Sequence, residues 1–96
     1  MIVSFADKGT EDIFDGLDTK AARKVLPSQL HAKAAGSLDR LNSAVSLRSL
    51  SLPRLRLEKL KGDRVGQHSI RTNNQYRICF RWTDAGAEHV QIVDYH

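Results

Sequence analysis

Cysteine is nearly absent from this sequence: Cys79 is the single one among 96 residues. One cysteine cannot form a disulfide within the chain, and it cannot build a thiolate zinc site by itself. This composition excludes the disulfide-rich class of small secreted domains and fits a reducing cytoplasm. Because Cys79 lies between two arginines with no histidine near it in the sequence, we expect a buried or half-buried structural thiol.

Long apolar runs are also missing. No run approaches the roughly 20 residues that a helix needs to cross a bilayer. The first twelve residues include acidic side chains and lack a basic region ahead of their apolar part, so they do not resemble a signal peptide. With no repeat, linker or low-complexity segment, the chain is expected to form one cytoplasmic domain over residues 1–96, without membrane contact.

The sequence lacks the common signatures of metal, nucleotide and serine-nucleophile sites. Its four histidines have no metal-ligand spacing, and neither an HExxH motif nor a paired-cysteine motif occurs. Residues 61–66, KGDRVG, contain two glycines but lack the Gly-Lys-Ser/Thr of a phosphate-binding loop. We therefore expect these residues to form a turn, and we expect no metal ion and no cofactor.

Positive charge is plentiful, and it is unevenly distributed. Residues 1–47 carry six cations and six carboxylates, residues 48–81 carry nine cations against two carboxylates, and residues 82–96 carry three carboxylates. Seven of the nine central cations are arginine, whose planar guanidinium donates paired hydrogen bonds to phosphate. A solvated structural face is one interpretation. A polyanion partner, nucleic acid first, is the interpretation that we favour.

The first part of the sequence predicts one strand and short helices. The β-branched apolar run at residues 2–6 has the length and composition of a strand. Thr10 followed by two acidic residues is typical of a helix start, and Gly16 is expected to end that helix. Residues 19–26 are expected to add a further helical turn.

The clearest helix is predicted from Pro27 or Ser28 to Val45. Gly36 within it costs about 1 kcal/mol relative to alanine, unless a neighbour packs closely there. His31 is expected to be a solvated residue of this helix. Apolar residues recur along one face with a 3.6-residue period, at Leu30, Ala34, Leu38, Leu41 and Val45.

Strands are predicted in the second half of the sequence. Leucines alternate with polar residues most regularly from Arg54 onward, which is the period of a strand with Pro53 at its edge or start. Asn73 and Asn74 are turn residues between two further alternating segments. Four strands are therefore expected, at residues 54–60, 68–72, 76–82 and 89–95.

These elements define the expected fold class. Strands joined by short connections are antiparallel, and helices that precede them pack on one face. The prediction is an α+β fold, a small antiparallel sheet with N-terminal helices packed on one face. The core face of the central strand is predicted to carry Tyr76, Ile78, Phe80 and Trp82. The opposite face is predicted to display Arg71, Arg77 and Arg81.

Charged and titratable residues in the second half of the sequence could together support RNA cleavage. Without a metal, the 2′-hydroxyl needs a base, the phosphoryl oxygens need cations, and the leaving 5′-oxygen needs an acid. Lys61 and Arg77 suit the second task, and Arg77→Ala should then cost activity with little loss of fold. His96 suits the first or third task, because an ordinary histidine titrates near pH 6.5. Asp94 or Tyr95 could share the proton transfer, although Tyr95 points away from its neighbours along an ideal strand.

Three blocks of sequence carry a resemblance to a known family. They are LKGDR-x-G-x-x-SI at residues 60–70, N-x-Q-Y-R-I-x-F at residues 73–80, and the closing DYH. In order and spacing they resemble the HigB-type (host inhibition of growth) toxins of the RelE superfamily. The resemblance implies a compact antiparallel sheet with helices on one side. It also implies metal-independent endonuclease activity on mRNA at the translating ribosome.

The same resemblance implies site residues. The motif lysine falls on Lys61, the strand arginine on Arg77, and the closing residues on Asp94, Tyr95 and His96. Glu58 stands where some family members have a catalytic histidine, so either this carboxylate or the C-terminal residues could supply the base. The cations expected to contact RNA are Arg54, Arg56, Lys59, Arg64, Arg71 and Arg81.

The resemblance also implies partners. The expected inhibitor is a HigA-type antitoxin with a helix-turn-helix domain, and the toxin would meet operator DNA only through it. A second interpretation stays open because Glu58 departs from the family pattern. The chain could bind ribosomal RNA or the ribosome with weak or no cleavage, interfering with ribosome function or assembly.

Overall fold

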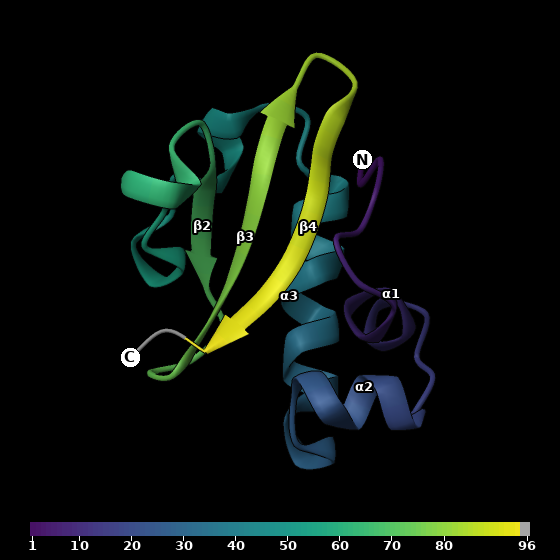
Figure 1. Cartoon of the computed structure of the whole chain (residues 1–96). Helices are drawn as coiled ribbons and strands as arrows, with labels where there is room; N and C mark the ends of the chain where they lie inside the picture. Colours follow the sequence, from purple (N-terminus) through teal and green to yellow (C-terminus); the bar gives the residue numbers. More distant parts are fainter. Residues whose placement is uncertain (95–96) are drawn as a thin grey trace.

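The computed structural model describes residues 1–94 and contains a four-stranded antiparallel sheet with helices packed against β4 (Figure 1). The helices are α1 (Lys8–Phe14), α2 (Lys20–Val25) and α3 (His31–Ser43). Short 3₁₀ helices are η1 (Ser28–Leu30), η2 (Leu47–Leu50), η3 (Pro53–Leu55) and η4 (Gly62–Arg64). The strands, in sheet order, are β1 (Glu58–Lys59), β2 (His68–Arg71), β3 (Tyr76–Thr83) and β4 (Gly86–Asp94). The predicted α+β class is confirmed.

The hydrophobic core lies between α3 and one face of the sheet. Leu38 and Leu41 of α3 are fully buried together with Ile70 of β2. The predicted core face of β3 is also confirmed, because its alternating apolar residues belong to the same cluster: Tyr76, Ile78, Phe80 and the partly buried Trp82. Among residues 1–94, no helix is long and apolar enough to cross a membrane.

The predicted helix over residues 27–45 differs from the structure at both ends. The chain begins with the 3₁₀ turn η1, and α3 ends at Ser43 because Ala44 is extended. Val45 is therefore 91% exposed and is not a core residue. His31 is not solvated either: its ring is largely buried, and its Nε2 donates to the carbonyl of Leu26 over 2.8 Å. That bond joins the end of α2 to the start of α3.

Residues 2–6 do not form a regular strand, so this prediction is wrong. This segment instead makes two isolated parallel bridges to β4, between Ile2 and Ala87 and between Phe5 and Val90. Between these bridges β4 contains a bulge, where the register with β3 shifts and His89 takes a left-handed φ of 54°. The bulge interrupts the edge of β4, so the N-terminal segment bonds on either side of it rather than continuously.

The start of α1 also differs from the prediction. Asp7 is the N-cap, and its carboxylate accepts from the backbone N–H of Thr10 over 2.6 Å. Thr10 is buried inside the helix, and its hydroxyl accepts from the N–H of Ile92, which ties α1 to β4. Gly16 follows the helix with a φ of 77°, as expected for its stop.

The strand predicted at residues 54–60 is wrong for most of its length. The leucine-rich segment forms η2 and η3, and only Glu58–Lys59 pair as a strand. Ser46 caps η2, and Pro53 begins η3, where its missing N–H costs nothing. Leu50 and Leu55 are buried three residues after Leu47 and Leu52, a spacing that also fits a 3₁₀ turn.

We expect Leu38→Ala to lower the free energy of unfolding by about 2–5 kcal/mol, because it removes a fully buried side chain and leaves a cavity. Val45→Ala is the matched control and should change it by less than about 0.5 kcal/mol. Urea denaturation of the two variants measures both values. Similar losses in the two variants would contradict the observed end of α3.

His68 should make folding sensitive to acid. Burial, and secondarily the positive charge of Lys59, lower the pKa of His68, whose ring stacks on Phe80. Below about pH 6.5 the unfolded chain therefore binds a proton that the folded chain resists, so stability falls as pH decreases there. We expect His68→Phe to lose less stability than the wild type between pH 7 and pH 5 in urea titrations. Parallel losses would contradict this prediction.

Candidate active site

Arg77 lies in β3, but it is not displayed on an open face as predicted. The residue is only 7% exposed. Its Nε donates to Ser69 Oγ over 2.7 Å, and its Nη2 donates to the carbonyl of Arg56 over 2.5 Å. The exposure prediction fails because the chain that follows η3 covers this part of the sheet. Arg77 therefore has a structural role as well as any chemical one.

A pocket of about 200 Å³ opens beside Arg77. We call it the candidate active-site pocket, and its lining residues are Arg56, Glu58, Arg71, Asn73, Asn74 and Arg77. Three guanidinium groups and two side-chain amides can donate hydrogen bonds to phosphoryl oxygens, and one carboxylate can accept a proton. This composition suits the charge development of phosphodiester cleavage.

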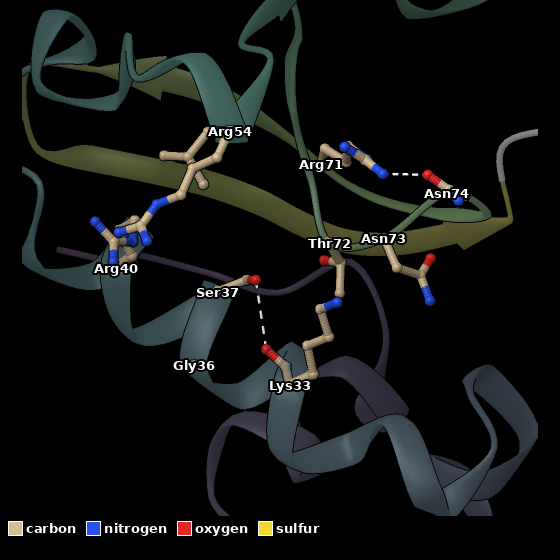
Figure 2. Close-up of a pocket in the computed structure, with 10 residues that line it drawn as sticks. Lys33, Gly36, Ser37, Arg40, Arg54, Arg71, Thr72, Asn73 and Asn74 are labelled. Carbon is tan, nitrogen blue, oxygen red and sulfur yellow. Dashed lines mark hydrogen bonds between the residues drawn. The ribbon is translucent and has the colours of Figure 1, made fainter.

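Secondary structure positions the walls of this pocket. Glu58 lies in β1 opposite Ser69 of β2, and Ser69 in turn lies opposite Cys79 of β3. The β2–β3 turn is fixed by Asn73, whose side-chain oxygen accepts from two following backbone N–H groups. Asn74 accepts from Arg71 across the same turn, as Figure 2 shows. The pocket is therefore built on paired strands and a well-bonded turn.

The structure does not bring every predicted residue into this pocket. Lys61 is exposed at the start of η4 and does not line it. Asp94 lies opposite Tyr76, whereas Arg77 lies opposite Val93. Directly paired residues share a face of a sheet. Asp94 therefore shares a face with Tyr76 and lies on the other side of the sheet from Arg77.

The end of β4 nevertheless lies close to the turn that lines the pocket. The side-chain amide of Gln75 donates to the carboxylate of Asp94 over 3.1 Å. The predictions for Tyr95 and His96 fall outside the described residues. Both remain predictions.

The predicted RNA-contacting cations do not all lie in one region. Arg56 and Arg71 line the candidate active-site pocket. Arg64 bonds to Gln67 and Gln91, and exposed Arg81 is 4.0 Å from Glu88, so these two lie over the sheet rather than in the pocket. Exposed Arg54 lies in η3 and exposed Lys59 in β1.

Cys79 is fully buried, as expected for a structural thiol. Burial raises the pKa of its thiol, although the nearby charges of Arg64 and Arg77 partly oppose that effect. A thiol held protonated is a poor nucleophile. Within residues 1–94, no three His, Cys, Asp or Glu side chains are grouped so that they could hold a metal ion.

The family of RelE-like toxins of type II toxin–antitoxin systems described as HigB matches residues 3–96. This chain belongs to that family. Toxin HigB-1 of Vibrio cholerae serotype O1 is 35% identical over 88 residues, which cover 91% of this chain and 90% of the relative. Endoribonuclease HigB of Proteus vulgaris is 30% identical over 96 residues, the full length of both chains.

A solved structure supports the fold of this HigB-like chain. It is the YoeB–YefM complex from Staphylococcus aureus, which matches with a TM-score of 0.60 and 14% sequence identity. The match covers 100% of this chain and 98% of the other. At that identity the likeness shows the fold alone.

Three contributors to the site of this HigB-like toxin were not predicted. Asn73 and Asn74 line the pocket, although the sequence indicated only that they form a turn. Ser69 holds the guanidinium of Arg77. Ser69 occupies the strand position that alternation places on the same face as the arginines, and this signal could have identified it.

We expect Arg77→Ala to lower the free energy of unfolding by roughly 1–3 kcal/mol, because it leaves the buried hydroxyl of Ser69 and the partly buried carbonyl of Arg56 without their donor. This replaces the expectation that the substitution would cause little loss of fold. Arg54→Ala is the control, since it removes an exposed arginine and should cost less than about 0.5 kcal/mol. Equal stability of the two variants in urea denaturation would show that the buried contacts of Arg77 are unimportant.

Proposed function

We propose that this chain is the toxin of a type II toxin–antitoxin pair and cleaves messenger RNA on the ribosome without a metal ion. The proposal is carried by one observation: Glu58 and three arginines converge in a pocket of about 200 Å³. Its support from relatives is the family membership and the Proteus vulgaris relative named as an endoribonuclease.

The proposed reaction uses the 2′-hydroxyl of the message as its nucleophile. Glu58 accepts the proton from this hydroxyl, and the oxygen attacks the adjacent phosphorus while the bond to the 5′-oxygen breaks. Arg71 and Arg77 stabilise the negative charge that gathers on the phosphoryl oxygens, and exposed Arg56 assists them. Glu58 suits a base because it is exposed and lines the same pocket as the three arginines, where its carboxylate oxygens can accept a proton from the substrate.

The leaving 5′-oxygen needs a proton donor. Tyr95 and His96 are the proposed candidates, because β4 leads toward the turn that lines the pocket. Asp94 lies on the other face of the sheet, and we propose that it contributes by positioning the end of β4 through its hydrogen bond from Gln75. Lys61 is a proposed additional phosphate contact near the message. These assignments divide the chemistry between a base on β1 and an acid at the end of the chain.

The proposed partners follow from the proposed activity. An antitoxin of the HigA type would neutralise the toxin, and operator DNA would be contacted only through that antitoxin. The proposed location is the cytoplasm, because a protein that acts on the translating ribosome must meet it there. The YoeB–YefM complex gives a precedent for a partner on this fold.

The test is primer extension on a defined message with purified ribosomes. We expect the wild type to cut and Glu58→Gln to reduce the cleavage rate by about 10²–10⁴-fold, because the amide cannot accept the proton. Glu11→Gln, the same change on α1, should cut like the wild type. A variant that lacks His96 tests the proton donor.

Two outcomes would contradict parts of this proposal. Unchanged cleavage by Glu58→Gln would remove Glu58 as the base and leave that role to the C-terminal residues. Ribosome binding by folded wild-type protein without any cuts would replace the nuclease with the alternative, interference with ribosome function or assembly.

A further inference from the structure

A second and larger pocket lies beside the candidate active-site pocket. It has a volume of about 510 Å³ and lies where α3, η3 and the end of β2 come together (Figure 2). We call it the α3 groove. The lining residues that matter here are Lys33, Ser37, Arg40, Arg54, Arg71 and Thr72. Arg71, Asn73 and Asn74 line both pockets, so the two are continuous along the β2–β3 turn.

The charged side chains that line the α3 groove are all positive. Two of its cations, Lys33 and Arg40, lie seven residues apart on α3 and therefore on one side of that helix. Figure 2 shows Lys33 pointing toward Thr72 and Arg54 pointing toward Arg40. No carboxylate occurs among the described residues that line the groove. Cations drawn from three separate elements repel one another, and a bound anion relieves that repulsion.

A buried hydroxyl without a partner supplies an independent observation. Thr72 is 7% exposed and lines the groove. Its Oγ1 is shielded from solvent and makes no hydrogen bond within residues 1–94. Buried hydroxyls are usually bonded, and an unbonded one destabilises the fold. The described chain provides no acceptor for this hydroxyl, and a phosphate oxygen in the groove would accept from it once the side chains that shield it move aside.

The floor of the groove is open at Gly36. A Cβ built there would meet nothing within 4 Å outside the neighbouring helix backbone. No packed neighbour therefore compensates the stability that a glycine costs inside a helix. The helix backbone at Gly36 is accessible from the groove, which suits the close approach of a ligand.

We propose that the α3 groove binds a phosphodiester group of the RNA strand, beyond the phosphate that reacts in the candidate active-site pocket. This inference rests on the proposed function and adds a second backbone contact to it. The shared wall of Arg71, Asn73 and Asn74 would let one strand run from the active-site pocket along α3. The phosphate could belong to the message or to ribosomal RNA, since the chemistry of recognition is the same.

The first experiment measures binding without chemistry. A fluorescent 2′-O-methyl RNA oligonucleotide cannot be cleaved, and its anisotropy reports affinity across a series of salt concentrations. We expect the double variant Lys33→Ala/Arg40→Ala to bind on the order of tenfold more weakly and to reduce the slope of log affinity against log salt by about 1.4, for two lost single-strand phosphate contacts. The matched control is Lys20→Ala/Lys24→Ala, which removes two exposed cations from α2.

A second variant tests the hydroxyl. Thr72→Val keeps the shape of the side chain and removes its unbonded oxygen. The wild-type fold gains nothing from that oxygen within residues 1–94, so the urea midpoint of the variant should not fall. Its affinity for the oligonucleotide should fall about threefold or more, because the hydroxyl no longer donates a hydrogen bond to the phosphate. A structural role alone would instead lower the midpoint and leave affinity unchanged.

A parallel titration with small ribosomal subunits free of message distinguishes the two sources. Weaker oligonucleotide binding by the Lys33/Arg40 variant supports a message phosphate. Weaker subunit binding with normal oligonucleotide binding supports a ribosomal RNA phosphate. The inference is overturned if the variant matches the Lys20/Lys24 control on both ligands, including the case in which only antitoxin binding is lost.

The experiments distinguish failure of the groove inference from failure of the nuclease proposal. If the wild type fails to cut messages but its RNA affinity depends on Lys33 and Arg40, the groove inference stands and the nuclease proposal fails. If the wild type cuts and the groove variant binds like its control, the groove inference fails alone.

Discussion

The guanidinium of Arg77 is buried between β2 and the chain that follows η3, where a cation is stable only when acceptors surround it. Ser69 and the carbonyl of Arg56 are two of these acceptors. Arg56 presents its carbonyl from a left-handed conformation, with a φ of 45°, which a residue with a side chain seldom adopts. One buried charge therefore ties two strands and a strained turn together, and the candidate active-site pocket opens at that point.

The same contact matters because the segment at residues 47–67 has little regular structure of its own. It contains three 3₁₀ turns and the two-residue strand β1, which pairs only with β2. Buried Leu50 and Leu55 anchor it to the core. The hydrogen bond from Arg77 to Arg56 adds a polar anchor beside Glu58. The placement of the proposed base thus depends on the same interaction that buries the proposed cation, so stability and chemistry are coupled here.

The accuracy of the sequence-based predictions followed the length of each periodic pattern. The helix α3 and the β2–β3 hairpin were predicted because several turns or strand positions agree on one period. The strand at residues 54–60 was predicted from the alternating leucines, yet Leu52 and Leu55 are three residues apart, a spacing that fits a 3₁₀ turn equally well. Alternation assigned Arg77 to the correct face of β3. It could not show what covers that face, because the covering chain is distant in sequence.

The distribution of charge along the sequence did not show which charged residues lie together in the folded chain. Residues 1–47 are neutral in total, yet Lys33 and Arg40 lie beside Arg54 and Arg71 of the basic middle third. Their spacing on α3 was visible in the sequence, but only the fold shows that this side of the helix faces η3 and the hairpin. A concentration of like charge opposes folding, and a polyanion that binds only the folded chain stabilises it by mass action. The proposed RNA binding would therefore stabilise the folded chain, because it would relieve the repulsion among these cations.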